Sequence, residues 1–211
     1  MTALRRQLMG YLAGQFGRPH GLVGRGVAIL LNRTSRRAVE AAVQLSAAAP
    51  GEVVADIGFG GGVGLGLLLD RVGDSGAVHG IDISADMLAR ASSHYSREVA
   101  AGRLKLTKGS LTRLPLADGC LGAAITVNTL YFVPALDQAF AELFRVLKPR
   151  GRLVVGLLDP EVMARLWVGS GVMARPVAEI AAAVEHVGFE LVEQREITKA
   201  PFRFHLLAAR R

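Results

Sequence analysis

The sequence predicts an α/β fold of the doubly wound kind, with a mostly parallel seven-stranded sheet that ends in an antiparallel hairpin and follows N-terminal helices. Three observations predict this fold. From Glu52 onward, short apolar runs alternate with amphipathic helical stretches, as in consecutive βαβ units. The first run ends in a cluster of glycines. The last two runs are separated only by residues 198–201, too few for a crossover, so they should pair antiparallel.

Residues 1–50 are predicted to form a helical N-terminal extension or lid. Apolar residues recur at every fourth position from Leu4 to Phe16, which is typical of an amphipathic helix. Two further helical stretches are predicted over 22–32 and 35–48, and a proline and a glycine follow the second. The remaining residues, 51–211, have the size of one domain.

The first part of this domain alternates between strands and helices. Apolar runs predict buried parallel strands over 53–57, 77–82, 104–107, 121–127 and 152–158. Helical spacing predicts the intervening helices over 63–72, from the N-cap Ser84 to Tyr95, and from Leu136 to Leu147, where residues 148–151 close the last one.

The end of the chain is predicted to leave this parallel pattern. Residues 159–175, which include Trp167 and two glycines, are expected to be a mobile connection. Pro176 is placed to begin a helix that Gly188 ends. The last two strands are predicted over 189–197 and 202–208, and they form the hairpin at the edge of the sheet.

The composition excludes a disordered or fibrous chain, because 51% of the 211 residues are hydrophobic and 20% are charged. The single cysteine, Cys120, cannot close an intrachain disulfide, which favours a reducing cytoplasm. Outside the first few residues, the apolar runs fall far short of the ~20 residues that a membrane-spanning helix needs. An arginine pair at Arg5 and Arg6 lacks the apolar stretch and cleavage site of an export signal.

The net charge of +7 belongs mostly to residues 1–50, which hold seven arginines against one acid, Glu40. Arginine far outnumbers lysine, a composition typical of a GC-rich bacterium, so the basicity is weak evidence for a nucleic-acid partner. Docking at an anionic membrane surface is a further alternative. The arginines are spread over several short elements rather than clustered, which favours a solvated helix face instead.

The glycine cluster after the first strand predicts a nucleotide-like ligand. In Asp56-Ile57-Gly58-Phe59-Gly60-Gly61-Gly62, glycines permit positive φ and close approach of a ligand to the backbone. The N–H groups of the following helix face the same place, which lies at the carboxyl end of a parallel strand. The dinucleotide pattern G-x-G-x-x-G does not fit, because its last position falls on Val63 or on Leu65.

The pattern of an acid, one residue and then G-x-G-x-G resembles motif I of the class I S-adenosyl-L-methionine (AdoMet)-dependent methyltransferases. Asp82 ends the second strand, as an acidic residue does in that family. Residues 108–118 look like the adenine-side loop, and residues 145–153 are close to the family segment R-x-L-K-P-G-G-x-L. The resemblance spans about 51–158 and points to the branch that contains quinone-biosynthesis and other small-molecule methyltransferases. It implies a Rossmann-like fold.

The resemblance also implies roles for individual residues. Asp82 would hold the ribose hydroxyls, with helix capping as the alternative, and Asp56 would pair with the cofactor's ammonium group or only tether the glycine loop. The carbonyl groups of Val127 and Asn128 would receive the same ammonium, and Leu111 would offer its N–H to adenine. The other residues expected at the cofactor are Gly58, Phe59, Gly60, Gly62, Ile83, Met87 and Ser110.

Four positions depart from the family. Ser110 stands where an acid usually follows the glycine of the adenine-side loop, which weakens any side-chain bond to the adenine amino group. Leu121 and Gly122 replace a frequent Phe-Asp pair. Phe59 is bulky for its place, and either faces the methionyl part of the cofactor or wedges the loop.

Methyl transfer from a sulfonium is an in-line displacement, so the protein mainly has to orient the reactants. A general base is needed only for a protonated acceptor. The candidates for such a base, or for acceptor contacts, are Tyr11, His20, Tyr131 and Asp159, and a tyrosine at position 131 is more often a wall than a base. The spacing of His, Cys and acidic residues suggests no metal site.

The function that these observations predict is transfer of a methyl group from AdoMet to a small-molecule acceptor, with S-adenosyl-L-homocysteine as the product. One alternative is a cofactor-binding module without turnover. Another is an RNA methyltransferase, but residues 128–131 do not form the N/D-P-P-Y/F sequence of exocyclic amine methylation, and only 6% of the chain is aromatic. The sequence leaves open whether the protein is a monomer or a homodimer.

Overall fold

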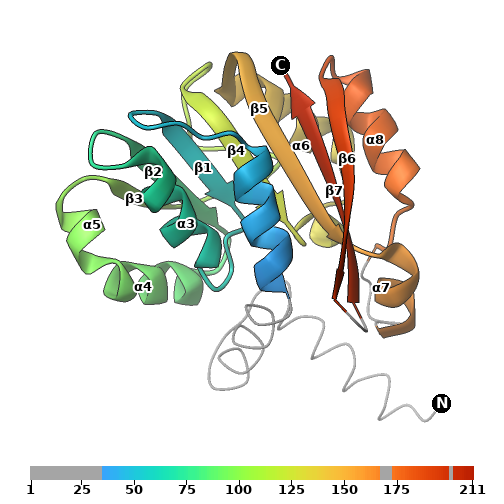
Figure 1. The fold of residues 1–211 in the computed structure, drawn as a ribbon, viewed down its shortest axis with the longest axis horizontal. Helices are drawn as coiled ribbons and strands as arrows, with labels where there is room; N and C mark the ends of the chain where they lie inside the picture. Colours follow the sequence, from blue (N-terminus) through green and yellow to red (C-terminus); the bar gives the residue numbers. More distant parts are fainter. Residues whose placement is uncertain (1–34, 167–172, 200–201) are drawn as a thin grey trace.

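The computed structural model describes residues 35–166, 173–199 and 202–211, and these residues form a layered α/β structure (Figure 1). A seven-stranded sheet has the strand order β3-β2-β1-β4-β5-β7-β6. Its strands are β1 (Val53–Ile57), β2 (Ala77–Asp82), β3 (Leu104–Lys108), β4 (Leu121–Val127), β5 (Leu147–Leu158), β6 (Glu190–Lys199) and β7 (Phe202–Arg210). The first five run parallel, and β7 pairs antiparallel with both β5 and β6. The predicted fold class and its closing hairpin are confirmed.

Helices cover both faces of the sheet (Figure 1). They are a helix over 35–45, α3 (Val63–Val72), α4 (Ala85–His94), α5 (Ser96–Ala100), the 3₁₀ turn η1 (Leu130–Phe132), α6 (Leu136–Val146), α7 (Pro160–Leu166) and α8 (Val177–His186). One apolar cluster packs α6 and α8 against the sheet, and a second packs the helix over 35–45, α3 and α4 against it. Two separate cores on opposite faces are what a doubly wound sheet requires. The two predicted helices before residue 35 lie outside the described residues.

The strand order of the sheet reverses at β1, between β2 and β4. Strand β1 pairs with β2 on one side and with β4 on the other, so the strand order reverses here. In open α/β sheets, ligands bind outside the carboxyl ends of the strands at such a reversal. The glycine turn after Ile57 lies at this point.

Strand β5 begins earlier than predicted. Helix α6 was predicted to reach Leu147 and to be closed by residues 148–151, but β5 starts at Leu147, which is fully buried and pairs with Leu121. The register then shifts before Ala123, and Arg150 adopts a positive φ of 66°. The segment with Pro149 and Gly151 does end the helix as expected, but the chain resumes pairing at once as an irregular strand because Leu147 belongs to the core.

A short helix, α7, occupies part of the segment that was expected to be a mobile connection. The carboxylate of Asp159 accepts hydrogen bonds from the N–H groups of Glu161 (3.0 Å) and Val162 (3.3 Å), and Pro160 takes the first helical position. The signal was present as Asp-Pro but was not interpreted as a helix start. Trp167 and the glycines after it lie outside the described residues. The helix α5 was also not predicted, and the helix described from residue 35 ends at residue 45, before the predicted end at residue 48.

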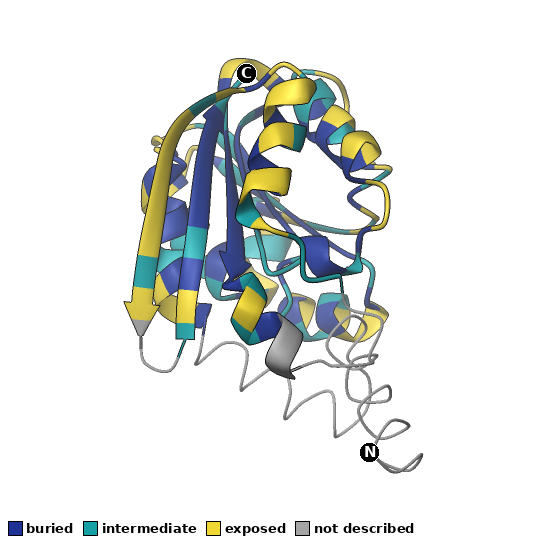
Figure 2. Ribbon diagram, turned by 90° about the vertical axis from the view of Figure 1, so that its right-hand side faces the viewer, coloured by how far each residue is buried: buried dark blue, intermediate teal, exposed yellow. Residues whose placement is uncertain are grey.

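The free edge of the sheet is polar. Strand β6 is exposed along most of its length, while β7 beside it is mostly buried (Figure 2). The exposed residues of β6 include three glutamates and Arg195, and charged side chains on an edge strand oppose pairing with another sheet. Within the described ranges, no helix has the length and apolar character needed to cross a bilayer.

Candidate functional site

The turn after β1 depends on its glycines. Gly58, Gly60 and Gly62 have φ values of 73°, 51° and 83°, in the left-handed region that side chains rarely adopt. The N–H of Gly58 donates to the carbonyl of Ile81 on β2 at 2.7 Å, which ties the turn to the neighbouring strand. A Cβ atom at Gly58 would collide with the side chain of Thr129, which follows β4. The turn is therefore packed between β2 and β4.

Asp82 holds this turn against the start of α4. One carboxylate oxygen accepts the N–H of Gly60 at 3.0 Å, and the other accepts the N–H of Ser84 at 2.9 Å. The residue is 7% exposed. Burial raises the pKa of Asp82, and the backbone hydrogen bonds, from Ser84 first, oppose this effect. Ser84 itself caps α4 through Met87, as predicted, so Asp82 is not the residue that caps this helix.

Asp56 is a second buried carboxylate in this site. It is the second-last residue of β1 and is 4% exposed. It packs so closely on α3 that a Cβ at Gly64 would collide with its carboxylate. Burial, and then the negative charge of Asp82, raise the pKa of Asp56 to about 8. Among the described residues, no cation forms an ion pair with it. A buried carboxylate without a cation suits a positively charged ligand.

Tyr95 supports the turn from the other side, a role that the sequence analysis missed. Its hydroxyl donates to the carbonyl of Gly62 at 2.9 Å. A Cβ at Gly66 would lie 2.9 Å from the hydroxyl oxygen of Tyr95. Two glycines four residues apart thus leave room on α3 for the aromatic ring. Two glycines at helical spacing indicate that another group packs closely on this helix, but the sequence alone does not identify that group as Tyr95.

The end of β4 is braced by Asn128, which has a positive φ of 59°. Its side-chain amide donates to the hydroxyl of Ser35 at 2.9 Å, and its side-chain oxygen accepts the N–H of Leu158 at 2.9 Å. The side chain therefore links the helix over 35–45 to β5. The carbonyl of Val127, expected to receive a ligand ammonium, accepts the hydroxyl of Thr129 at 3.3 Å. Neither Ser35 nor Thr129 was identified from the sequence.

The loop after β3 closes the site beyond Asp82. The N–H of Gly109 donates to the carbonyl of Asp82 at 3.1 Å. The hydroxyl of Ser110 lies 3.0 Å from the hydroxyl of Thr112, so its polar group is used within the loop. Leu111 is buried. This loop borders the site through its main chain more than through polar side chains.

The other residues expected at the cofactor differ in exposure. Phe59 and Met87 are buried in the core that includes α3 and α4, and Ile83 is half-buried. A Cβ at Gly80 would lie 3.3 Å from the Phe59 ring. Of the two roles expected for Phe59, wedging the turn against β2 fits this position better.

Two of the four candidate bases, Tyr131 and Asp159, have structural hydrogen-bond partners in the structure. Tyr131 is 2% exposed, its hydroxyl donates to the carbonyl of Leu158 at 2.8 Å, and burial raises its pKa well above the usual range. Asp159 is buried, caps α7, and contacts Arg203 at 2.9 Å and His205 at 3.0 Å. Burial works to raise the pKa of Asp159, but the His205 bond and the other partners hold it below its usual range. Tyr11 and His20 lie outside the described residues.

No group of three or more His, Cys, Asp or Glu side chains that could hold a metal ion is found in the part of the chain that the structure describes. The polar groups that converge at the carboxyl edge are two buried carboxylates, a glycine turn and the main chain of two loops. This arrangement can receive a ligand that has hydroxyl groups at one end and a positive charge at the other.

Comparison with known proteins agrees with this geometry. Residues 55–155 match a family described as "Methyltransferase domain". Over 160 residues the chain is 28% identical to arsenite methyltransferase of Halobacterium salinarum, covering 70% of this chain and 40% of the relative. Over 113 residues it is 34% identical to the ubiquinone/menaquinone biosynthesis C-methyltransferase of Legionella pneumophila, covering 54% and 45%. The matches span less than half the length of these curated relatives.

Solved structures share the fold. A SAM-dependent methyltransferase from Aquifex aeolicus superposes with a TM-score of 0.73 at 22% identity, covering 87% of this chain and 96% of the other. Geranyl diphosphate C-methyltransferase from Streptomyces coelicolor A3(2) gives a TM-score of 0.74 at 15% identity, covering 100% and 99%. At these identities the likeness shows the Rossmann-like architecture.

The buried Asp56 carboxyl predicts a pH-dependent stability. Its pKa is about 8 in the folded protein and near 3.8 in the unfolded chain, so the folded protein holds a proton that the unfolded chain has released between these values. Stability should therefore fall as pH rises from about 4 to 8, by at most about 1.4 kcal/mol per pH unit. We expect Asp56→Asn to raise the melting temperature of the unliganded protein at pH 8.5, with a gain that shrinks towards pH 4. The exposed Asp70→Asn is the control, and a gain that is the same at every pH would contradict the assignment.

Tyr131→Phe should cost about 1 kcal/mol of unfolding free energy, because it leaves the carbonyl of Leu158 without its donor while keeping the buried ring. Urea unfolding at pH 7 measures this cost. A variant as stable as the parent chain would mean that the hydroxyl has no structural role, and would return Tyr131 to the candidate bases.

Proposed function

Because residues 55–155 match a family described as "Methyltransferase domain", we propose that the protein transfers a methyl group from AdoMet to a small-molecule acceptor. The observation that carries this proposal is the pair of buried carboxylates, Asp56 and Asp82, beside a glycine turn at the strand reversal. Calorimetric titration of the purified protein with AdoMet and with S-adenosyl-L-homocysteine tests it. Absence of binding by folded protein would overturn it.

The residues of the site fit this cofactor. Asp82 already accepts two backbone hydrogen bonds, and a carboxylate has about four acceptor positions, so it retains capacity for the ribose hydroxyls. Gly58 and Gly60 lack the Cβ atoms that would keep a ligand from the backbone. Asp56 lacks a described cation and would pair with the ammonium group. The main chain at Leu111 would receive the adenine.

AdoMet supplies, when bound, a methyl group on a positively charged sulfur. The contribution of this chain would be to bind and orient, and orientation can supply about 7 to 11 kcal/mol of such a barrier. Asn128 and Thr129 hold the end of β4 beside the turn, where an acceptor would approach. Since Tyr131 and Asp159 have structural partners, we propose that a base, where the acceptor needs one, comes from Tyr11 or His20.

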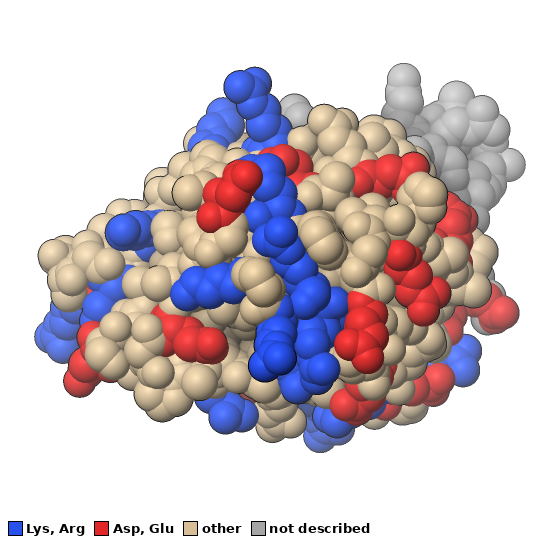
Figure 3. Space-filling view, turned by 90° about the horizontal axis from the view of Figure 1, so that it is seen from above, with Lys and Arg blue, Asp and Glu red and all other residues tan. Residues whose placement is uncertain are grey.

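A small molecule is the acceptor class that we favour. The curated relatives are named for methylation of arsenite and for ubiquinone and menaquinone biosynthesis, and these names describe those proteins. Against an RNA acceptor, Lys and Arg side chains gather in a band on the face seen from above (Figure 3). The parallel strands begin at this face, whereas the glycine turn follows the carboxyl end of β1. Exposed Lys148 and Arg150 begin β5 there, and Arg210 ends β7. A module without turnover would bind the cofactor and yield no methylated product from any acceptor in a broad panel.

We also propose a role for residues 1–50 and a cellular location for the protein. We propose that residues 1–50 form a helical extension next to the acceptor site, since Ser35 contacts Asn128 at the end of β4. A bacterial cytoplasm would suit a chain with one cysteine and an arginine-rich composition.

Asp82→Ala should weaken binding of S-adenosyl-L-homocysteine at least tenfold, because hydrogen bonds to a charged group contribute about 1.5 to 3 kcal/mol each. Calorimetry at pH 7.5 measures the change. Asp82→Asn retains one acceptor oxygen for the backbone, so its affinity should lie between those of Asp82→Ala and the parent protein. Asp70→Asn, on the exposed side of α3, should bind with the affinity of the parent. Undiminished affinity in Asp82→Ala would remove the ribose role.

Binding at pH 7 should release a proton. The pKa of Asp56 is about 8 in the free protein, so the carboxyl is mostly protonated at pH 7, and a ligand ammonium beside it would lower that pKa and ionise it. Titrations in buffers with different ionisation enthalpies count the protons released. The release should disappear in Asp56→Asn, and equal release by the variant and the parent would show that another group ionises.

A further inference from the structure

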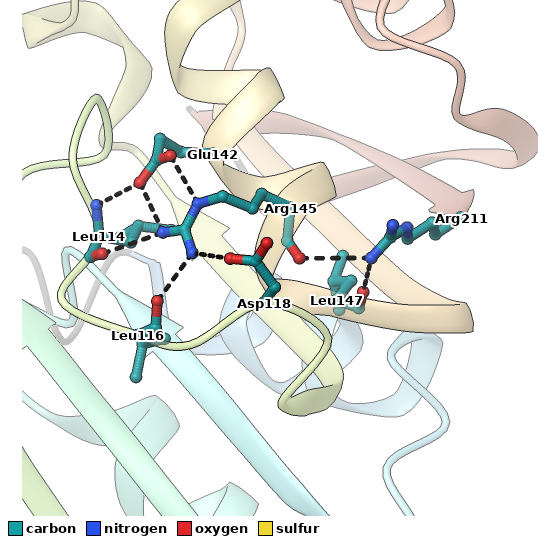
Figure 4. A network of polar contacts seen from close by, with 7 residues as sticks. All are labelled: Leu114, Leu116, Asp118, Glu142, Arg145, Leu147 and Arg211. Carbon is teal, nitrogen blue, oxygen red and sulfur yellow. Dashed lines mark hydrogen bonds and ion pairs between the residues drawn. The ribbon is translucent and has the colours of Figure 1, made fainter.

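Arg145, near the end of α6, begins the segment 145–153 that the site described above leaves without a role. Its guanidinium reaches across to the loop between β3 and β4 (Figure 4). One terminal nitrogen donates to the carbonyl of Leu116 at 2.8 Å and to the carboxylate of Asp118 at 2.6 Å. The other terminal nitrogen donates to the carbonyl of Leu114 at 3.1 Å. Arg145 therefore contacts the loop at three places.

Glu142, one turn earlier on α6, completes the arrangement. Its two carboxylate oxygens accept from Arg145, one from Nε at 2.8 Å and the other from a terminal nitrogen at 2.9 Å. The second oxygen also accepts the N–H of Leu114 at 2.7 Å. An arginine side chain has five N–H donors, and these contacts use all five. We call Arg145 and Glu142 the guanidinium clamp.

The loop that the clamp holds has little regular structure of its own. Over residues 109–120 the hydrogen bonds within the loop are the short turn at Ser110 and its contacts with Thr112. At its start, the N–H of Gly109 donates to the carbonyl of Asp82, and near its end the N–H of Gly119 donates to the carbonyl of Arg145 at 2.9 Å. The loop is thus suspended between the candidate site and α6.

The clamp also pairs the two carboxylates that contact the loop with Arg145. Asp118 and Glu142 are the carboxylates that touch this segment, and both are bonded to Arg145. Ser110 uses its hydroxyl within the loop. The nucleoside base of a ligand beside the loop would therefore contact main-chain groups, and the position of these groups depends on where the loop is held.

We infer that the guanidinium clamp is a positioning device for the cofactor: Arg145 and Glu142 hold residues 109–116 where their main chain receives the nucleoside base. This inference rests on the proposed function. The clamp touches neither the reacting methyl group nor the acceptor, so it should set the affinity for the nucleoside part of the ligand. Lysine cannot replace Arg145, because an ammonium has three donors and lacks the planar fork that reaches four partners together.

The experiment compares two ligands. S-adenosyl-L-homocysteine contains both the nucleoside and the amino-acid part, whereas 5′-methylthioadenosine lacks the amino-acid part. We expect Arg145→Lys to weaken both ligands by about the same factor, roughly tenfold, as expected for the loss of one or two hydrogen bonds. Asp56→Asn should weaken only the first ligand. Arg71→Lys is the matched control, because Arg71 lies exposed in the last turn of α3, away from the glycine turn, and its side chain has no hydrogen bond or ion pair with a described residue.

A second readout needs no ligand. Hydrogen exchange of the unliganded protein should show faster exchange at the N–H groups of Leu114 and Gly119 in Arg145→Lys, with β1 and β4 as slow as in the parent. Faster exchange throughout the sheet, with both ligands weakened, would mean a general loss of stability and would overturn the positioning role. Should Arg145→Lys fail to fold, Glu142→Gln replaces it, with a smaller weakening of about threefold for both ligands.

The outcomes separate the two proposals. If the parent protein binds neither ligand, the proposed function fails. If the parent binds both ligands and the clamp variants bind them equally well, the clamp has no part in binding and the inference fails. A loss confined to S-adenosyl-L-homocysteine would also overturn it, because the clamp would then act on the amino-acid end.

Discussion

The structure depends on two carboxylates buried side by side at the point where the sheet changes direction. Asp82 is compensated by backbone N–H groups from the turn and from the start of α4, whereas the burial of Asp56 raises its pKa to about 8 and no described cation offsets it. The two acids therefore differ in what they do for the empty protein. Asp82 helps to build the turn, and Asp56 costs stability that a positively charged ligand can return. The protein's own backbone thus offsets the charge of Asp82, whereas the charge of Asp56 would be offset by a positively charged ligand.

The glycines of the site make room for neighbouring side chains as well as for a ligand. Thr129 lies against Gly58, the carboxylate of Asp56 against Gly64, and the hydroxyl of Tyr95 against Gly66. Each missing Cβ atom thus lets a side chain from another element come close. Through these contacts β4 and α4 share in holding the turn, and a change in either element is transmitted to the site by direct packing.

The sequence predicted the elements whose signals are local. Strands β1, β2 and β4 were found with their bounds, because a buried parallel strand is a nearly continuous apolar run and glycine, aspartate or asparagine marks where each one ends. The start of β5 was wrong, since a segment with Pro149 and Gly151 indicates a helix end and conceals the pairing of Leu147. Asp56 and Asp82 were recognised from their places at the ends of strands, where Asp56 is second-last in β1 and Asp82 is last in β2. Ser35 and Tyr95 were not, because their contacts are with residues 93 and 33 positions away, and one sequence holds no record of such pairings.

The contact between Ser35 and Asn128 matters for any attempt to redesign the protein. Asn128 adopts a left-handed backbone conformation, which asparagine tolerates better than most residues, and its side-chain amide donates to Ser35, the first described residue of the chain. A chimera that replaces the chain upstream of residue 35 with that of a relative would thus join the body of the protein at a hydroxyl–amide pair. A serine or threonine at position 35 preserves the hydrogen bond with Asn128. A chimera with another residue there would lose this bond next to the candidate ligand site.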